Sequence, residues 1–191
     1  MLNADQVQEL LEACGAILRG HFSLTSGAHS PVYVQSSLIV GDPVLGQRLA
    51  RAVSSGPWRS GTTCVLGSVL GGIILAYEVA RTLGVRAVYA ERLQGVLHLA
   101  RGFDLTAADR VLVVDDVVIT GGTIHELLQL VSSRGAEVTG VGVLVDRAEG
   151  PLEFGVPYHV LAKLQVPSWS PDVCPLCRQG RPLTRPRHGR L

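Results

Sequence analysis

Two adjacent carboxylates followed directly by a glycine-rich loop are the residues of this sequence best suited to chemistry. The stretch VLVVDDVVITGGT, residues 111–123, passes from an apolar strand pattern into Asp115 and Asp116 and then into TGGT, residues 120–123. The loop enters a helix pattern, so backbone N–H groups and two hydroxyls surround one point at a helix N-terminus, an arrangement that binds phosphate. Carboxylates accept hydrogen bonds from vicinal ribose hydroxyls and orient Mg²⁺ through water. The pattern favours a sugar-phosphate site over a strand end that simply exits to solvent.

This loop differs from the two common glycine motifs for nucleotides. A phosphate loop of the Walker type ends in Gly-Lys-Ser/Thr, and no such ending follows Asp116. The dinucleotide fingerprint GxGxxG requires a different glycine spacing after its first strand. The sequence therefore predicts another class of phosphate site.

Composition narrows the class of protein. The chain has 191 residues with 47% hydrophobic and 17% charged residues and a net charge of +1. This is enough apolar material for one folded domain, and the near-zero charge argues against a nucleic-acid-binding face. No segment has the pattern of a secretion signal or of a membrane span, and the four cysteines do not form a disulfide framework. We expect a cytoplasmic α/β protein with neither nucleic acid nor membrane as a partner.

The periodicity predicts a central parallel sheet flanked by helices. A first helix capped by Asp5, short strands and turns over residues 22–40, and a helix from Asp42 to about Ser55 precede it. From residue 62, strands alternate with helices, which indicates a parallel sheet covered on both faces. The expected strands are residues 62–67, 86–90, 110–116, 137–147 and 157–166, and the expected helices are residues 72–83 and 123–135. About fifteen residues after Ala90 read as an irregular loop.

Three segments are expected along the chain. Residues 1–40 form an N-terminal helix and hood, residues 41–165 form the α/β core, and residues 166–191 form a Pro- and Arg-rich tail. In open α/β sheets, ligands bind at the carboxyl ends of the strands. We therefore expect GSVLGG, the loop after Ala90, the DDVVITGGT stretch and Arg147 to lie at one edge of the sheet.

The stretch VLVVDDVVITGGT resembles the 5-phosphoribosyl 1-diphosphate (PRPP) binding motif of type I phosphoribosyltransferases. The resemblance implies that PRPP is bound by Asp115, Asp116, Val117, Val118, Ile119, Thr120, Gly121, Gly122 and Thr123. Ile119 departs from the motif, which usually has a small or hydroxylated residue there. One side-chain hydrogen bond is thereby lost, while the backbone amide remains.

Other segments are similar to the short bacterial orotate-specific members of this family. FSLTSGAHSPVY, residues 22–33, matches their F-x-L-x-S-G-x-x-S-P segment, which implies a hood over the base, and LVDR, residues 144–147, matches the strand end whose arginine contacts the orotate carboxylate. A guanidinium can bind a carboxylate with two parallel hydrogen bonds, although an ion pair of Arg147 with Asp146 or Glu149 is the alternative. The implied orotate-binding residues are Arg147, Thr25, Ser26, Gly27, Tyr33 and Ile119.

The resemblance implies a pyrophosphate-binding loop at GSVLGG, formed by Gly67, Ser68, Val69, Leu70, Gly71 and Gly72. Its glycines let backbone amides approach a phosphate, or alternatively allow tight strand–helix packing. Residues 91–103 correspond to the family's mobile loop, which closes over the active site of the neighbouring subunit of a homodimer. Arg92, His98 and Arg101 are the catalytic candidates there, beside Asp115 and Asp116.

Familiar lysines of the family are absent from the hood, where Thr25 stands, from GSVLGG and from residues 91–103. Because the chain contains a single lysine, Lys163, a general replacement by arginine is one explanation, and altered activity or specificity is the other. The resemblance implies transfer of phosphoribosyl from PRPP to orotate with Mg²⁺, which is held mainly through PRPP without a direct protein ligand. The alternatives are a purine-base phosphoribosyltransferase and a PRPP-sensing regulator that retains the fold.

Cys174 and Cys177 have the spacing of zinc ligands, but a tetrahedral site requires four. His159, His188 or a second subunit are candidates for the remaining ligands. A structural Zn²⁺ site, a redox disulfide and plain thiols all remain open for this pair.

Overall fold

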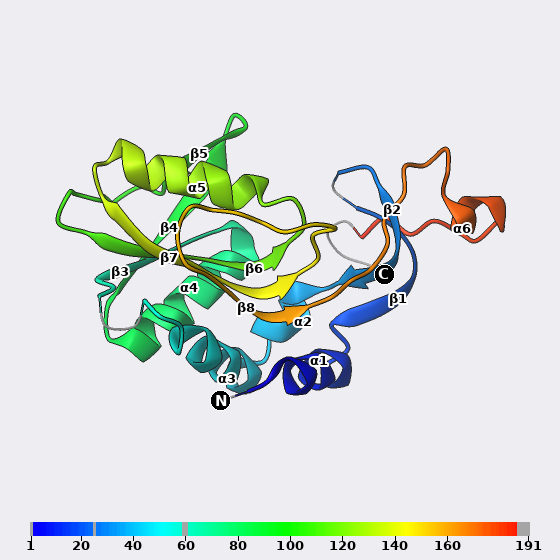
Figure 1. The fold of residues 1–191 in the computed structure, drawn as a ribbon, viewed down its shortest axis with the longest axis horizontal. Coiled ribbons are helices and arrows are strands. Elements are labelled where there is room, and N and C mark those ends of the chain that lie inside the picture. Colours follow the sequence, from blue (N-terminus) through cyan, green and yellow to red (C-terminus); the bar gives the residue numbers. More distant parts are fainter. Residues whose placement is uncertain (1, 25, 59–60, 187–191) are drawn as a thin grey trace.

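The computed structural model of the chain describes residues 2–24, 26–58 and 61–186. Its centre is a six-stranded sheet in the order β5-β4-β3-β6-β7-β8 (Figure 1), in which the edge strand β5 alone runs antiparallel to its neighbour. The strands are β3 (Cys64–Ser68), β4 (Arg86–Leu93), β5 (Val96–Leu99), β6 (Arg110–Val118), β7 (Glu137–Asp146) and β8 (Tyr158–Lys163). The predicted fold class, a parallel sheet flanked by helices, is confirmed.

Helices cover both faces of this sheet. In Figure 1, α3 (Pro43–Ser54) and α4 (Val69–Leu83) lie below it, and α5 (Gly122–Ser133) lies above it. Side chains alternate along β6 accordingly: Leu112 and Val114 belong to the core on the α3–α4 side, and Val111 and Val113 belong to the core on the α5 side. The apolar run before Asp115 is continuous because both faces of the strand are buried.

The N-terminal helix α1 (Ala4–Ala13) packs against β8, and its cap differs from the prediction. Asn3 caps the helix, accepting a hydrogen bond from the backbone N–H of Gln6, while the Gln6 side chain accepts one from Asn3. The expected cap Asp5 lies within the first turn instead. Such a reciprocal capping box satisfies two backbone donors, which a cap at Asp5 would not achieve.

Helix α3 starts at Pro43, as predicted, and Asp42 is its N-cap residue. Helix α4 begins at Val69, three residues earlier than expected from the glycines. Residues 36–40, predicted as strand or turn, form the short helix α2 (Ser36–Val40).

The segment after Ala90 is not an irregular loop, and this prediction was wrong. Strand β4 continues to Leu93, and Leu93 pairs with Val96 at the start of β5. The two intervening residues, Gln94 and Gly95, both have positive φ angles, 50° and 86°. Two-residue turns of this kind match the twist of a β-hairpin. The hairpin escaped detection because most of its side chains are exposed, so its strands lack an apolar alternation.

A two-stranded antiparallel ribbon, β1 (Ile17–Ser23) and β2 (His29–Val34), lies beside the sheet, at the right of Figure 1. The tail pairs with both edges of this ribbon. Trp169 exchanges two backbone hydrogen bonds with His29, and Thr184 bonds to the backbones of Ser23 and His21. Between them lies the single turn α6 (Pro175–Arg178). The first strand thus starts five residues earlier than predicted, and the ribbon is completed by residues far along the chain.

Among the helices that the structure describes, none combines the length and apolar character that crossing a membrane requires.

Tight packing of α4 on β3 gives the first prediction. A Cβ atom at Gly67 would lie 2.1 Å from the backbone oxygen of Gly72. Gly67→Ala should therefore lower the free energy of unfolding by at least about 2 kcal/mol, because backbone must move to accommodate the methyl group. Gly150→Ala is the control, since no atom lies within 4 Å of its added Cβ. Urea denaturation of both variants measures the difference, and equal stabilities would contradict the packing argument.

Candidate functional site

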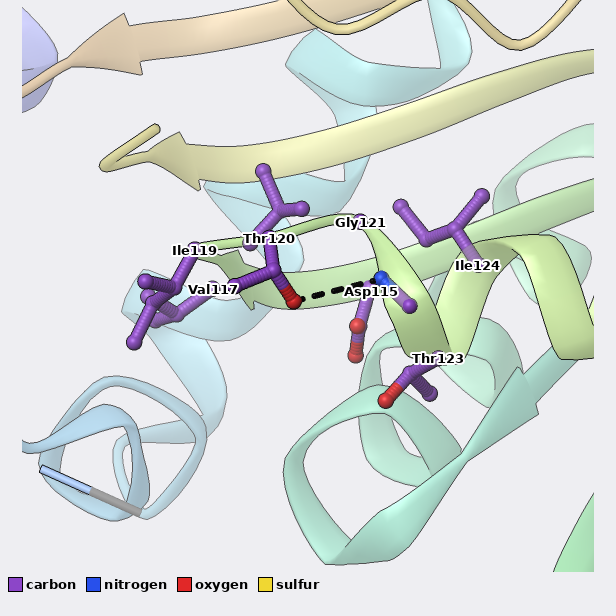
Figure 2. Close-up of a pocket in the computed structure, with 9 residues that line it drawn as sticks. Asp115, Val117, Ile119, Thr120, Gly121, Thr123 and Ile124 are labelled. Carbon is purple, nitrogen blue, oxygen red and sulfur yellow. Dashed lines mark hydrogen bonds between the residues drawn. The ribbon is translucent and has the colours of Figure 1, made fainter. Parts of the chain in front are cut away.

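The predicted phosphate loop lines a depression of about 140 Å³ at the carboxyl end of β6. It is lined by Asp115 and by every residue from Val117 to Ile124, and Figure 2 shows the loop turning from the strand into α5. The N-cap residue of α5 is Gly121, which has no side chain to make a capping hydrogen bond. The Gly122 N–H donates to Thr120 Oγ1 over 3.4 Å, drawn as the dashed line in Figure 2. An uncapped helix N-terminus leaves backbone donors free for an anion.

Gly121 is required at the turn into α5. Its φ angle is 77°, a left-handed conformation that side chains with a Cβ rarely adopt, and a Cβ here would lie 3.2 Å from the ring of Phe154. The glycine therefore sets the direction in which the first turn of α5 faces the depression.

A second uncapped helix N-terminus lies at the junction of β3 and α4. Ser68 is the N-cap residue, but its side chain makes no capping hydrogen bond, and its buried Oγ has no partner among the described residues. Val69 has a φ angle of 56°, which is strained for a β-branched residue. Strain and an unpartnered buried hydroxyl together are typical of a binding site rather than of a packing joint.

The first turn of α4 lies directly against the two carboxylates. A Cβ at Gly71 would lie 1.8 Å from Asp116 Oδ2, and one at Gly72 would lie 3.0 Å from Asp115 Oδ1. Gly71 and Gly72 thus allow α4 to approach Asp115 and Asp116 closely. The carboxylate pair has a helix N-terminus on each side, those of α4 and α5.

Burial changes the ionisation of Asp115. The carboxyl is buried, and this desolvation, together with the charge of Asp116, raises the pKa of Asp115 well above its ordinary value. Asp115 Oδ1 accepts a hydrogen bond from the Asp116 N–H at 3.1 Å, which offsets the effect only in part. In the absence of a cationic or hydroxylated ligand, the fold disfavours the charged form of Asp115.

Arg147 is buried one strand away from the loop. Its backbone N–H donates to the Val118 carbonyl at 2.8 Å, and its side chain is 5% exposed. The guanidinium donates from Nη2 to Ser30 Oγ at 3.0 Å, but its buried Nε has no partner among the described residues. Burial lowers the pKa of this guanidinium, and Tyr33 lies near enough to oppose the shift.

The alternative partners of Arg147 are engaged elsewhere. Asp146 lies 3.9 Å from Lys163 and accepts from the Ala148 N–H, and Glu149 accepts from the Ser168 hydroxyl. A buried cation without a carboxylate beside it is costly and is suited to a planar anionic ligand.

Comparison with known proteins decides the family. The family model described as phosphoribosyl transferase domain matches residues 48–170. The chain belongs to the phosphoribosyltransferase family. An orotate phosphoribosyltransferase of Caldanaerobacter subterraneus subsp. tengcongensis is 44% identical over 190 residues, covering 100% of both chains. One of Thermotoga maritima is 42% identical over 184 residues, covering 94% of this chain and 96% of the relative.

A solved structure agrees with these relatives. The crystal structure of orotate phosphoribosyltransferase from Aeropyrum pernix superposes with a TM-score of 0.72 at 30% identity, covering 83% of this chain and 94% of the other. The phosphoribosyltransferase fold therefore accounts for most of the chain.

Of the three catalytic candidates predicted in residues 91–103, Arg92 and His98 lie on the β4–β5 hairpin, and Arg101 lies in the turn that follows β5. Arg92 makes a two-pronged ion pair with Glu126 of α5, at 2.9 and 3.1 Å, and Nη1 also donates to the Gly95 carbonyl at 2.5 Å. His98 and Arg101 are exposed, and His98 faces Glu91 across the hairpin. No described hydrogen bond joins these three residues to the carboxylate pair within one chain.

The predicted base-site residues are only partly brought together. Tyr33 lies near Arg147, whereas Ser26 and Gly27 form an exposed turn closed by the Leu24–Ala28 hydrogen bond. Thr25 lies outside the described residues. Ile119 is half-buried on the loop, and its side chain points away from Thr123 in Figure 2. Sequence reasoning missed Ser30, although it stands inside the motif FSLTSGAHSPVY that pointed to the hood.

Metal-ligating side chains gather where the tail meets the ribbon. We call this group the ribbon–tail cluster; it consists of His21, His29, Cys174 and Cys177. Of the histidines named from sequence, His159 instead packs against Trp58 with ring centroids 5.7 Å apart, and His188 lies outside the described residues. His21 and His29 were missed because their distance from the cysteines along the chain gives no local signal.

The buried carboxyl gives a second prediction. In the unfolded chain Asp115 ionises near its ordinary pKa of 3.8, whereas in the fold it holds its proton to higher pH. The folded state therefore binds more protons, and its stability falls as pH rises from about 4 through the raised pKa. Asp115→Asn removes this cost, so the variant should be more stable than the wild type at pH 8.

Urea denaturation at pH 4.5 and pH 8 tests this, with no ligand present. The stability gain of Asp115→Asn should grow between the two pH values, while Asp5→Asn, an exposed aspartate of α1, should give no such growth. A gain for Asp115→Asn that is independent of pH would show that the carboxyl is not responsible.

Proposed function

We propose that this protein is an orotate phosphoribosyltransferase of pyrimidine biosynthesis. It transfers phosphoribosyl from PRPP to orotate, giving orotidine 5′-monophosphate and pyrophosphate, and we place it in the cytoplasm. The observation that carries the base assignment is Arg147, a buried guanidinium without a carboxylate partner, held one strand from the phosphate loop. The full-length relatives named for this activity support it.

PRPP fits the order of groups along the site. The 5′-phosphate binds the N–H groups and hydroxyls of residues 120–123, and the diphosphate binds at residues 67–72, where Ser68 Oγ lacks a partner. Between these loops, Asp115 and Asp116 accept hydrogen bonds from the ribose hydroxyls. This assignment places the 5′-phosphate at the N-terminus of α5 and the diphosphate at the N-terminus of α4.

Catalysis in this proposal is positioning and electrostatics. The bond from the anomeric carbon to pyrophosphate breaks while the orotate ring nitrogen attacks, and positive charge develops on the sugar. The carboxylates beneath the ribose stabilise that charge, and the buried setting strengthens the interaction. Little proton transfer is needed, since the attacking nitrogen of orotate can already be anionic.

Mg²⁺ fits the donor set as an ion brought in with PRPP. The adjacent carboxylates are oxygen donors suited to its bound water, and in the described part of the chain no third metal-ligating side chain joins them. When bound, the ion offsets the negative charge that develops on pyrophosphate. The residues proposed to orient it are Asp115 and Asp116.

Orotate is proposed to bind Arg147 through its carboxylate. Its carboxylate is planar and can accept hydrogen bonds from two guanidinium nitrogens, including the unpartnered Nε. Ser30 fixes the other side of the guanidinium, and Tyr33 lies nearby. Thr25, Ser26, Gly27 and Ile119 are the further residues proposed to bind orotate.

The segment of residues 91–103, which contains the tip of the β4–β5 hairpin, is proposed to act on the active site of a second subunit in a homodimer. Its tip carries Leu93 and Val96, which are 54% and 55% exposed and are apolar enough to pack against another chain. The ion pair of Arg92 with Glu126 holds the hairpin against its own α5. Arg92, His98 and Arg101 would supply the positive charge that lysines supply elsewhere in the family.

Turnover on orotate is the direct test of this proposal. With PRPP and Mg²⁺ present, the protein should consume orotate, followed by its ultraviolet absorbance, and should release one pyrophosphate per orotate. Adenine, guanine and hypoxanthine serve as competing bases under the same conditions. Turnover of a purine base without turnover of orotate would replace the proposal by the purine-base alternative.

Substitution of Arg147 tests its role in the base site. Arg147→Ala should raise the KM for orotate at least about tenfold, equivalent to about 1.4 kcal/mol, and should change the KM for PRPP much less. Arg147→Lys keeps the charge but loses the paired geometry, so an intermediate KM is expected. Arg134→Ala, which removes an exposed ion pair with Asp104, is the control. Equal changes in both KM values would remove Arg147 from the base site.

A further inference from the structure

The ribbon–tail cluster lies outside the site described so far, and its four ligand atoms face one point. All four lie within 4.8 Å of one another. His21 Nε2 is 3.2 Å from His29 Nδ1, 3.5 Å from Cys174 Sγ and 3.7 Å from Cys177 Sγ, and Cys177 Sγ is 3.3 Å from His29 Nδ1. A tetrahedral Zn²⁺ with ordinary bond lengths holds its ligands about 3.3 Å apart for two nitrogens and about 3.6 Å apart for nitrogen and sulfur. The four distances from His21 and between His29 and Cys177 are close to that geometry.

Hydrogen bonding alone does not account for this arrangement. His21 Nδ1 lies 2.9 Å from the Arg181 carbonyl, and because a carbonyl only accepts, Nδ1 carries the proton. In the neutral ring, Nε2 therefore has one lone pair to accept a hydrogen bond, yet three potential donors lie within 3.7 Å of it: His29 Nδ1, Cys174 Sγ and Cys177 Sγ. A single metal ion satisfies all four groups at once. The Arg181 carbonyl also fixes the tautomer and ring orientation of His21, as the outer partners of zinc-bound histidines do.

We propose that the ribbon–tail cluster binds one structural Zn²⁺. Two thiolates and two imidazoles favour zinc among the common divalent ions, and four protein ligands leave no open position for substrate or water chemistry. Three of the four residues are buried, and Cys177 closes the exposed side. The CxxC pair supplies two ligands from the turn that begins α6, and the ribbon supplies the other two.

The ribbon is shaped to present its two histidines together. The pairing of β1 with β2 shifts register between Arg19 and Phe22, so His21 lies in a β-bulge. Such a bulge re-aims one side chain relative to its neighbours. His29 pairs with Ser23 on the opposite strand, which places it diagonally across from His21. Their rings stand edge to face with centroids 5.0 Å apart.

The metal would connect chain segments that are far apart in sequence. His21 and Cys174 are 153 residues apart, and the tail also pairs with the ribbon through backbone hydrogen bonds at Trp169 and Thr184. A crosslink of this length removes many conformations from the unfolded chain. We therefore expect the ion to stabilise the ribbon and the tail as one unit.

The same unit leads to the base site through Ser30, the residue after His29. Its hydroxyl accepts from Arg147 Nη2 at 3.0 Å and donates to the Pro167 carbonyl at 3.2 Å. Ser30 therefore ties Arg147 to both the ribbon and the tail. Zinc would hold the Ser30 hydroxyl, and with it the Arg147 guanidinium, in one position. This effect on the base site rests on the proposed function, whereas the metal site itself does not.

Metal analysis of the full-length protein tests the site. The protein is prepared without a polyhistidine tag, from cells supplied with Zn²⁺ and under reducing conditions, and is then gel-filtered. Elemental analysis should find about one zinc per chain. Cys174→Ser and Cys177→Ser should each lose at least about nine-tenths of it, and Cys14→Ser and His159→Gln, which alter residues outside the cluster, should retain it. Less than one-tenth equivalent in the wild type, or equal zinc in all variants, would overturn the proposal.

Replacement by Co²⁺ identifies the ligands independently of activity. The Co²⁺ protein should show the visible bands of a tetrahedral ion and a thiolate-to-metal charge-transfer band. The charge-transfer band should weaken in Cys177→Ser, and the visible bands should shift in His29→Gln. An octahedral spectrum without charge transfer would contradict the assignment, even if zinc is present.

Stability and kinetics give the consequence for the fold. Removal of zinc by 1,10-phenanthroline should lower the Tm by at least about 5 °C in the wild type and should leave the Tm of Cys174→Ser unchanged. The Cys174→Ser variant should also raise the KM for orotate more than the KM for PRPP. Zinc binding with unchanged kinetics would retain the metal site and remove its link to Arg147. Zinc binding without any turnover of orotate would contradict the proposed function alone.

Discussion

The contact between the first turn of α4 and the carboxylates at the end of β6 is the constraint on which the rest of the site depends. No side chain fits at Gly71 or Gly67, so strand β3, helix α4 and strand β6 have a fixed separation. That separation brings two uncapped helix N-termini to one acidic pair. The adjacency of Asp115 and Asp116, which is unfavourable in isolation, is maintained because both sheet faces beneath it are fully packed.

Several features that disfavour folding lie at this edge of the sheet. Asp115 is buried beside a second carboxylate, Ser68 Oγ and Arg147 Nε lack partners in the described chain, and Val69 has a left-handed backbone. Elsewhere, strands and helices follow the ordinary rules of patterning and capping. Local rules are violated where a ligand can supply the missing charge or hydrogen bond, and the two apolar cores provide the stability that offsets the cost.

The sequence predicts those parts of the molecule whose signal is local. The parallel sheet, the start of α3, the phosphate loop and Arg147 each follow from a few consecutive residues and from strand order. The β4–β5 hairpin was not predicted, because its exposed strands carry no apolar alternation and only Gln94-Gly95 marks the turn. The pairing of Trp169 and Thr184 with the ribbon, and of His21 with Cys174, depends on three-dimensional proximity alone. No periodicity within either segment encodes that pairing.

The pairing of the tail with both edges of the ribbon also determines the order in which the protein can be completed during synthesis. Domains fold from the N-terminus as the chain leaves the ribosome, but β1 and β2 emerge long before the residues that flank them. An isolated two-stranded ribbon is marginal in water. The β1–β2 ribbon is therefore synthesised early but completes its backbone pairing late, once Thr184 has emerged. A chain that stops before that residue, even with its sheet intact, would lack the outer partner of β1.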